Sequence, residues 1–327
     1  MKLRNWIKLG ALSLVIPGMG LAIKSFLPQR FPTAEWPVAR EYPVPSDTAS
    51  FPVVNIEFLR CGSVTIPECI AVRGALSIAP RVIAHSAVLI RHPRATFLFD
   101  TGLCADVYTY LVNQSLLFRK TLANFTLEQP LRDHLMRLGI GYGDLDFALL
   151  SHLHWDHVSG IPDIPGVPLR INRVEYDAAR YGLFEANNGL VAELMCDNPI
   201  EYFACAGPAY EGFRSSHDLF GDGSIILVPL PGHTAGSTGM FINRSNGSRV
   251  FLIGDAAWVS ENYMRPATMH PFIWSGVTSD DATARETLIQ LHRYAMYHPS
   301  VPLIAMHDGA MQATFMAVER PLHASRT

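Results

Sequence analysis

Three histidines and an aspartate lie within six consecutive residues of the segment SHLHWDHVSG, residues 151–160. In an extended chain, residues two positions apart share a face, so His152 and His154 are predicted to point the same way. Where the chain then turns, Asp156 and His157 can reach a second, neighbouring point. Imidazole suits zinc and other transition metals, and carboxylate suits the harder members of that group. The segment therefore predicts two adjacent metal sites supplied by one loop.

Residues of metal-binding types also follow four other apolar runs. A complete coordination shell needs more donors than one loop supplies. His233 in LPGHTAGS is expected to join the first metal, and His307 in LIAMHDG to complete the second. Asp255 in LIGDAAW can bridge both ions with its two oxygens. Asp100 in LFDTG is expected to orient a ligand from outside the coordination shell.

Short β-rich runs separated by turns predict the strands that position these residues. RVIAHSAVLIRH, ATFLFDTG and DFALLS are three such runs, and the last delivers the histidines into a loop. Loops after strand ends can converge on one rim of a sheet. A helix is predicted over residues 126–139, where Thr126 and Gln129 are spaced as a capping box and Gly139 suits the end.

The N-terminus differs from the rest of the chain. Lys2, Arg4 and Lys8 precede the uncharged run of residues 9–23, which is the layout of a secretory signal. The run is shorter than the about 20 residues that span a bilayer as a helix. We therefore predict a signal peptide or membrane anchor over residues 1–27, with export to the periplasm or anchoring in the inner membrane. The alternative is a buried N-terminal helix of a cytosolic protein.

Composition and charge limit the domain organisation and the classes of partner. A proline-rich linker is predicted over residues 28–50 and one folded domain over residues 51–327. The formal net charge of −3 gives no electrostatic case for nucleic acid, so no such partner is expected. The cysteines leave two alternatives open: disulfide pairs between near neighbours in an exported protein, or small buried hydrophobes. These cysteines are Cys61, Cys69, Cys104, Cys196 and Cys205.

Taken in order, FDTG, SHLHWDH, LPGHTAGS, GDAAW and AMHDG resemble the five motifs of the metallo-β-lactamase superfamily, over roughly residues 51–310. The resemblance implies an α/β fold, the four-layer αββα sandwich, with two divalent metal ions, expected to be zinc, on the rim between two sheets. It implies that Asp255 bridges the ions. The ligands implied for the first metal are His152, His154 and His233, and those for the second are Asp156, His157 and His307.

Motif detail indicates a branch of this superfamily. ALLSHLHWDHVSG, RVEYDAAR and PGHTAGSTG are similar in kind and order to the N-acyl homoserine lactone lactonases. Those enzymes usually carry a tyrosine three residues after the bridging aspartate, where this chain has Trp258, which offers an N–H but no acidic hydroxyl. Tyr263 is a candidate replacement. The aspartate at position 255 and the lack of a motif cysteine argue against β-lactam hydrolysis.

The expected function is that of a dinuclear metal-dependent hydrolase. A metal-bridging hydroxide attacks the carbonyl of a small-molecule ester or lactone, and Asp255 passes a proton to the leaving alkoxide. A thioesterase or phosphodiesterase on the same site is one alternative. A catalytically silent metal-binding protein is another, although the full ligand set argues against it.

Two apolar segments are expected to wall the substrate site. Residues 176–222 form a long insertion that could cap it, and residues 259–276 could add a second wall. The histidines outside the motifs are expected to be structural or superficial, with His217 and His270 the strongest exceptions. They are His85, His92, His134, His217, His270, His292, His298 and His323.

Overall fold

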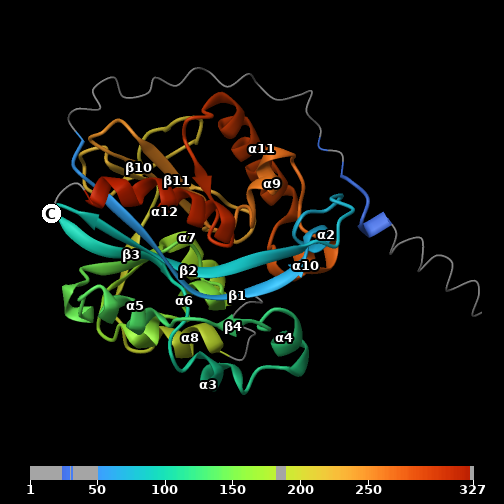
Figure 1. The fold of residues 1–327 in the computed structure, drawn as a ribbon, viewed down its shortest axis with the longest axis horizontal. Helices are drawn as coiled ribbons and strands as arrows, with labels where there is room; N and C mark the ends of the chain where they lie inside the picture. Colours follow the sequence, from blue (N-terminus) through green and yellow to red (C-terminus); the bar gives the residue numbers. More distant parts are fainter. Residues whose placement is uncertain (1–23, 30, 32–50, 182–188, 325–327) are drawn as a thin grey trace, which may run out of the picture.

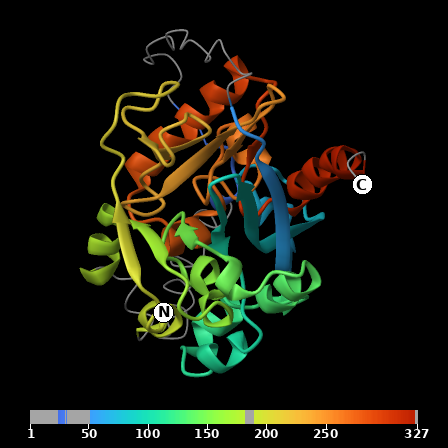
Figure 2. The ribbon, with the colours of Figure 1, turned by 90° about the vertical axis from the view of Figure 1, so that its left-hand side faces the viewer.

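The computed structural model describes residues 24–29, 31, 51–181 and 189–324. Two β-sheets pack face to face, and helices lie on the outer side of each (Figure 1). The view turned by 90° separates the helices around the second sheet from those below the first (Figure 2). This arrangement confirms the predicted four-layer α/β fold.

The first sheet has seven strands and carries the front half of the site. Its β1–β2–β3 portion is antiparallel, and β3, β5, β6 and β7 run parallel to one another. In sheet order the strands are β4 (Thr126–Leu127), β1 (Asn55–Pro67), β2 (Pro80–His92), β3 (Ala95–Thr101), β5 (Phe147–Leu150), β6 (Leu169–Asn172) and β7 (Ile200–Phe203).

The second sheet has five strands and carries the other half. β8 to β11 are antiparallel neighbours, and β12 joins β11 in parallel. In sheet order the strands are β12 (Leu303–Ile304), β11 (Arg249–Leu252), β10 (Thr238–Asn243), β9 (Ile225–Pro229) and β8 (His217–Asp218).

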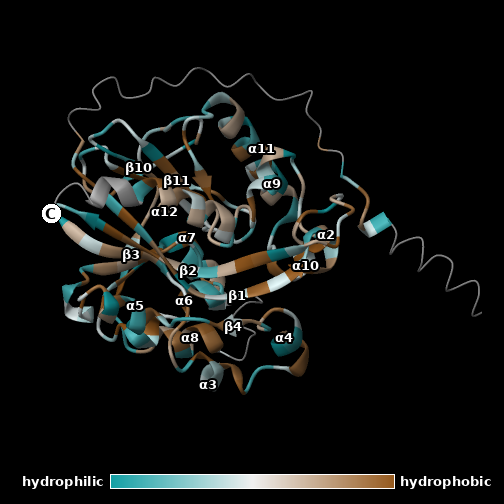
Figure 3. Cartoon of the chain, viewed as in Figure 1, coloured by the Kyte–Doolittle hydropathy of each residue, from teal (hydrophilic) through white to brown (hydrophobic). Residues whose placement is uncertain are grey.

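Alternation along the strands builds the layers, since successive side chains point to opposite faces. In β5, Phe147 and Leu149 pack between the two sheets, whereas Ala148 and Leu150 pack toward the helices. Both faces are covered, so such strands appear as continuous apolar runs in the sequence. Figure 3 shows hydrophobic residues along β2 and over α8, which packs under the first sheet.

Helices cover the outer faces. α3, α4, α5, α6 and α8 share a core with the first sheet, and α9 and α11 share one with the second. α12 packs on β1 and β2. The bounds are α2 (Glu68–Ala71), α3 (Val107–Leu111), α4 (Leu116–Thr121), α5 (Leu131–Arg137), α6 (Trp155–Val158), α7 (Arg173–Tyr181), α8 (Leu190–Met195), α9 (Ser260–Met264), α10 (Pro271–Val277), α11 (Asp281–Tyr297) and α12 (Gly309–Ala324).

The predicted start of one helix was wrong. α5 begins only at Leu131, with Pro130 as its N-cap, and the preceding Thr126–Leu127 forms β4 against β1. The amides of Glu128 and Gln129 donate to the carbonyl of Cys61, which holds this segment extended. The expected capping box therefore does not form. Gly139 does follow the helix end, in the left-handed conformation that glycine adopts readily.

The terminal predictions fall largely beyond the residues described. Most of the predicted signal or anchor and of the linker lies outside them, as does part of the insertion, residues 182–188. Within the described ranges, no helix is both long and apolar enough to cross a membrane. All five cysteines are free thiols, and Cys61, Cys69 and Cys104 are buried. The disulfide alternative is therefore not realised in this structure.

Candidate metal centre

Strand ends from both sheets bring the candidate ligands together. His152 follows β5 of the first sheet, and Asp100 lies near the end of β3. Three loops of the second sheet supply the rest: His233 lies between β9 and β10, Asp255 follows β11 and His307 follows β12. Buried strands fix where each loop begins, which is how residues far apart in the sequence meet at one point.

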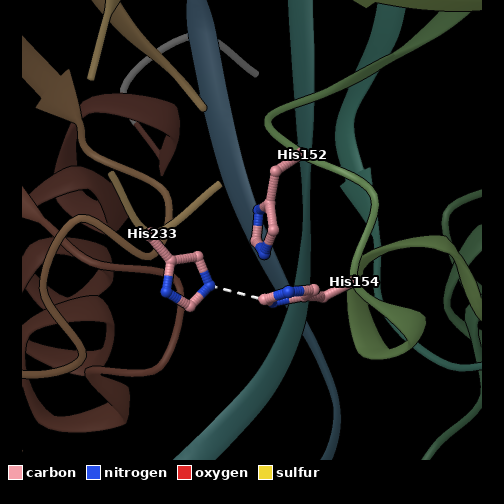
Figure 4. A group of neighbouring side chains, drawn as sticks. All are labelled: His152, His154 and His233. Atoms are coloured by element: carbon pink, nitrogen blue, oxygen red, sulfur yellow. Dashed lines mark hydrogen bonds between the residues drawn. The ribbon is translucent and has the colours of Figure 1, made fainter. Parts of the chain in front are cut away.

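His152, His154 and His233, the first group, point toward one another (Figure 4). One ring nitrogen from each lies within 4.8 Å of the others, and His233 Nε2 is 2.9 Å from His154 Nδ1. His152 Nδ1 faces the hydroxyl of Ser151 at 2.9 Å, which leaves Nε2 toward the group. Three buried imidazoles around one point form a donor set that suits zinc and similar transition metals.

Asp255 lies between the first group and the remaining histidines. Its Oδ2 is 2.9 Å from His307 Nε2 and 3.6 Å from His233 Nε2, and its Oδ1 is 3.3 Å from His157 Nε2. One carboxylate thus contacts donors implied for both metals. This is the position that a bridging ligand requires.

Asp156 contacts an imidazole that sequence reasoning had treated as structural. Its Oδ2 is 3.4 Å from His307 Nε2 and 4.0 Å from His157 Nε2. The same oxygen is 3.2 Å from Nδ1 of His85, a buried residue of β2. His85, expected to be structural or superficial, therefore lies within the cluster. The available signal was a histidine within the apolar run RVIAHSAVLI, since polar residues on a doubly covered strand need a partner.

Buried polar atoms without partners show that the residues fit a metal. Such atoms are costly to bury, and native proteins leave few of them. Within the part of the chain described, several atoms of the cluster make no hydrogen bond, and a cation would satisfy them all. They are Nε2 of His152 and His157 and Oδ1 of Asp255.

The two halves of the cluster differ in charge. Burial lowers the pKa of all three histidines of the first group, that of His233 to about 4. Burial also acts to lower the pKa of His157 and His307, but facing carboxylates, Asp255 first, outweigh it and raise both. Those imidazoles hold the pKa of Asp255 well below its usual value, against the effect of burial. The first group therefore favours the neutral imidazoles that a metal needs, whereas metal binding at His157 and His307 competes with protons.

Asp100 orients two residues of the cluster. Its Oδ1 accepts the backbone N–H of Ser151 at 2.7 Å, and its Oδ2 accepts the Ser151 hydroxyl and His157 Nδ1, each at 2.8 Å. It is fully buried and does not line the cavity described below. Asp100 is therefore a positioning residue, the role predicted for it as an outer carboxylate.

Glu175 is a second positioning residue, and it is not among the site residues predicted from the sequence. Its Oε1 accepts the N–H of Leu153 at 2.8 Å, and its Oε2 accepts the N–H of Gly236 at 2.9 Å. One carboxylate of α7 thus ties the HLHWDH loop to the loop that carries His233. A Cβ on Gly236 would lie 2.3 Å from the Glu175 backbone, so only glycine fits there. The signal was the acidic residue inside the quoted motif RVEYDAAR.

A sequence model described as the metallo-β-lactamase superfamily matches residues 80–285, more than half of the chain. The chain belongs to this superfamily. The match includes the HLHWDH loop, His233 and Asp255, and His307 lies beyond it.

Relatives and structural neighbours agree with the lactonase-like branch of the superfamily. The N-acyl homoserine lactonase AttM of Agrobacterium fabrum is 24% identical over 188 residues, which cover 58% of this chain and 67% of that enzyme. A variant of AiiA from B. thuringiensis, with N-decanoyl-L-homoserine at its active site, superposes with a TM-score of 0.60 at 18% identity, covering 81% of this chain and 96% of the other. AidC, a dizinc quorum-quenching lactonase, has a TM-score of 0.55 at 15% identity, covering 79% and 88%.

A cavity of about 440 Å³ opens beside the candidate metal centre. The residues that line it include His85, Asp156, Asp255 and His307. Its walls are mainly apolar, and they come from β1, β2, α4 and α10. The wall residues include Val64, Ile66, Ile83, Phe118, Leu122 and Ile273. The volume falls within the about 300–1,000 Å³ typical of small-molecule sites.

Trp258 and Tyr263 have different environments. The indole N–H of Trp258 donates to Asp255 Oδ2 at 3.2 Å, and its ring lines the cavity. Tyr263 is buried in the core, where its hydroxyl donates to the carbonyl of Leu303 at 2.8 Å. Tyr263 therefore does not replace the missing tyrosine. The indole of Trp258, three residues after Asp255, lies beside that carboxylate instead.

The expected walls were partly misplaced. Of the described part of residues 176–222, only Ala178, Ala179 and Val191 line the cavity, whereas its aromatic Tyr210 and Phe213 pack under α11. The other wall comes from the β1–β2 hairpin and α4, which no motif marked. His217 stacks on Phe203, and His270 caps α10, so neither joins the cluster. Residues 259–276 do contribute, through Ile273, Ser275 and Gly276.

Proposed function

We propose that this chain is a dinuclear metal-dependent hydrolase of carboxylic esters whose substrates are lactones with an apolar acyl chain. The observation that carries the proposal is Asp255, which contacts histidines of both metal groups and lines a largely apolar cavity. When bound, two divalent cations supply a hydroxide nucleophile at neutral pH and polarise the carbonyl. The cluster has donors for both.

The chain's own residues have separate tasks in this reaction. Asp255 is held by its histidine contacts and by the Trp258 N–H, and it is the carboxylate placed to pass a proton to the leaving oxygen. Asp100 and Glu175 keep the loops in register from outside. The walls exclude water and accept the acyl chain, as apolar pockets do.

Two observations favour lactones over the other substrate classes. The curated relatives are named for N-acyl homoserine lactone cleavage, although the matched region covers about two thirds of their length. In addition, no Lys or Arg is among the described residues that line the cavity. A phosphodiester would leave its charge there without a cationic side chain, because phosphate recognition generally uses Arg or Lys.

A hydrolysis screen tests the proposal. The full chain, stripped of metal and then loaded with Zn²⁺, Co²⁺ or Mn²⁺, is assayed against lactones of increasing acyl length, aryl esters, thioesters and phosphodiesters. We expect metal-dependent turnover with the highest kcat/KM for acylated lactones. Asp255→Ala should abolish it, and Asp106→Asn, at an exposed carboxylate without a capping hydrogen bond, should not. Activity that survives metal removal, or a preference for phosphodiesters, contradicts the proposal.

We also propose that the protein is exported, because a basic start precedes a short uncharged run at the N-terminus. Fusion of residues 1–50 to a reporter that is active only outside the cytoplasm tests this. Replacing Lys2, Arg4 and Lys8 with glutamate should abolish the signal. Equal reporter activity with the wild-type segment and with the glutamate-substituted segment contradicts export.

A further inference from the structure

His85 lies inside the cluster and is not among the ligands implied by the superfamily motifs. It projects from β2, where it pairs with Gly62 of β1, and only 5% of its surface is exposed. Its Nδ1 is 3.2 Å from Asp156 Oδ2, and its ring packs edge-on against His307, with centroids 5.4 Å apart. An eighth donor side chain therefore lies on the side of the second metal.

The spacing of the donors matches coordination better than simple packing. Ligand atoms about 2.0–2.1 Å from a tetrahedral zinc lie about 3.3 Å from one another. Asp156 Oδ2 is 3.2 Å from His85 Nδ1 and 3.4 Å from His307 Nε2. One donor atom from each of the three residues lies within 4.8 Å of the other two. A hydrogen bond from His85 to Asp156 alone would not require His307 to converge on the same point.

The backbone holds His85 where this geometry needs it. The neighbouring residue, Ala84, donates its N–H to the His307 carbonyl at 3.0 Å and accepts His307 Nδ1 at 2.6 Å. Two adjacent positions of β2 thus fix one ligand and present another imidazole. Trp155 and Phe125 pack against the His85 ring at centroid distances of 5.8 and 5.6 Å. A residue clamped in this way presents its donor without a large ordering cost.

We propose that His85 Nδ1 is an additional ligand of the second metal ion, beside Asp156 and His307. The inference rests on the proposed function for the presence of that ion. An extra imidazole makes the second site richer in nitrogen, and imidazole favours zinc, cobalt and nickel over manganese and magnesium. The second site should therefore select late transition metals more strongly than a site without His85.

Metal binding by the full-length chain tests the proposal without reference to turnover. Zn²⁺ and Co²⁺ affinities are measured by competition with a chelator for the wild type, His85→Asn and His85→Phe. Asparagine keeps a hydrogen-bond donor near the Nδ1 position but is a poor zinc ligand. We expect both variants to keep one ion at wild-type affinity and to lose affinity for the other by about 10–100-fold or more. The d–d spectrum of the second Co²⁺ equivalent should change as well.

A matched control and two contrary results complete the design. His92→Asn alters a buried histidine on the same strand, where the ring stacks on Phe220, and should leave both affinities unchanged. Wild-type affinity in His85→Asn, with loss only in His85→Phe, would mean that His85 merely donates to Asp156, and would overturn the proposal. Wild-type affinity in both variants would overturn it as well. A wild-type chain that binds no metal would instead refute the proposed function.

Discussion

Replacing Asp100 with asparagine should weaken the second metal site far more than it weakens the fold. The carboxylate accepts three hydrogen bonds of 2.7, 2.8 and 2.8 Å, two from Ser151 and one from His157 Nδ1. Asparagine tolerates the positive φ of 55° at this position, so the backbone need not move. Its single oxygen can still accept the Ser151 N–H, but its NH₂ then faces His157.

The substitution is expected to change which ring nitrogen of His157 carries the proton. If the Nδ1–H of His157 faces this NH₂ group, it has no acceptor, and burying such an unsatisfied donor costs about 1–3 kcal/mol. The ring can avoid this cost by moving its proton to Nε2, the atom that faces Asp255 and the metal position. A protonated Nε2 cannot bind a cation. We therefore expect the affinity for the second ion to fall about 10–100-fold, as for other residues that orient a metal-bound histidine.

Two assays separate these effects. Urea unfolding of the metal-free chain should show a loss of no more than about 1–3 kcal/mol, and chelator competition should show the loss of one tight site. Asp106→Asn, at an exposed position, should change neither measurement. Two ions bound with wild-type affinity by Asp100→Asn would refute the claim that this carboxylate sets the proton on His157.

Three further outcomes are expected. Glu175→Gln removes one of the two acceptors that tie the HLHWDH loop to the His233 loop, so kcat/KM should fall about tenfold with a smaller change in unfolding free energy. If Glu175→Gln and Glu175→Ala lose the same activity, and each loses it in proportion to the fraction of unfolded protein, the role of Glu175 is purely structural. Trp258→Phe removes the N–H donated to Asp255 and should lower kcat about tenfold, measured by steady-state lactone hydrolysis. An unchanged kcat would mean that this hydrogen bond has no role in turnover. The metal-free chain should lose stability as pH falls from 6.5 to about 4, by up to about 1.4 kcal/mol per pH unit for a group such as His233, since its folded pKa lies below its unfolded value and the unfolded chain takes up the proton first. For His157 the sign reverses: its raised pKa stabilises the metal-free fold below pH 6.5, and that contribution is lost as pH rises through the folded value. Urea unfolding in chelator at pH 5, 6.5 and 8.5 should therefore give its highest value near 6.5, and a monotonic profile would contradict these assignments.

The sequence allowed the strands and most of the cluster to be predicted, because both signals are local. HLHWDH carries its spacing within six residues, and each remaining candidate follows an apolar run that had to be a buried strand. The resemblance then ordered these residues into two metal groups. The fold it implied is confirmed, and the structure brings every predicted ligand to one place.

What the sequence did not reveal depends on tertiary contacts. His85 and Asp156 are 71 positions apart, and a histidine within an apolar run indicates a buried partner without identifying it. Glu175 acts through two backbone amides, so the acidic residue in RVEYDAAR does not by itself reveal which loops it joins. The start of α5 was misjudged because the extension of β4 along β1 overrode a local capping pattern. Tyr263 is close to Trp258 in sequence, but α9 turns it into the core.

Activity measured against equivalents of added metal tests the central claim most directly. Metal-free full-length chain is titrated with Zn²⁺ or Co²⁺, and hydrolysis of an acylated lactone is recorded at each step. Two ions bridged by Asp255 predict turnover that reaches its plateau at two equivalents per chain. A plateau at one equivalent, or turnover that needs no metal, would contradict the account.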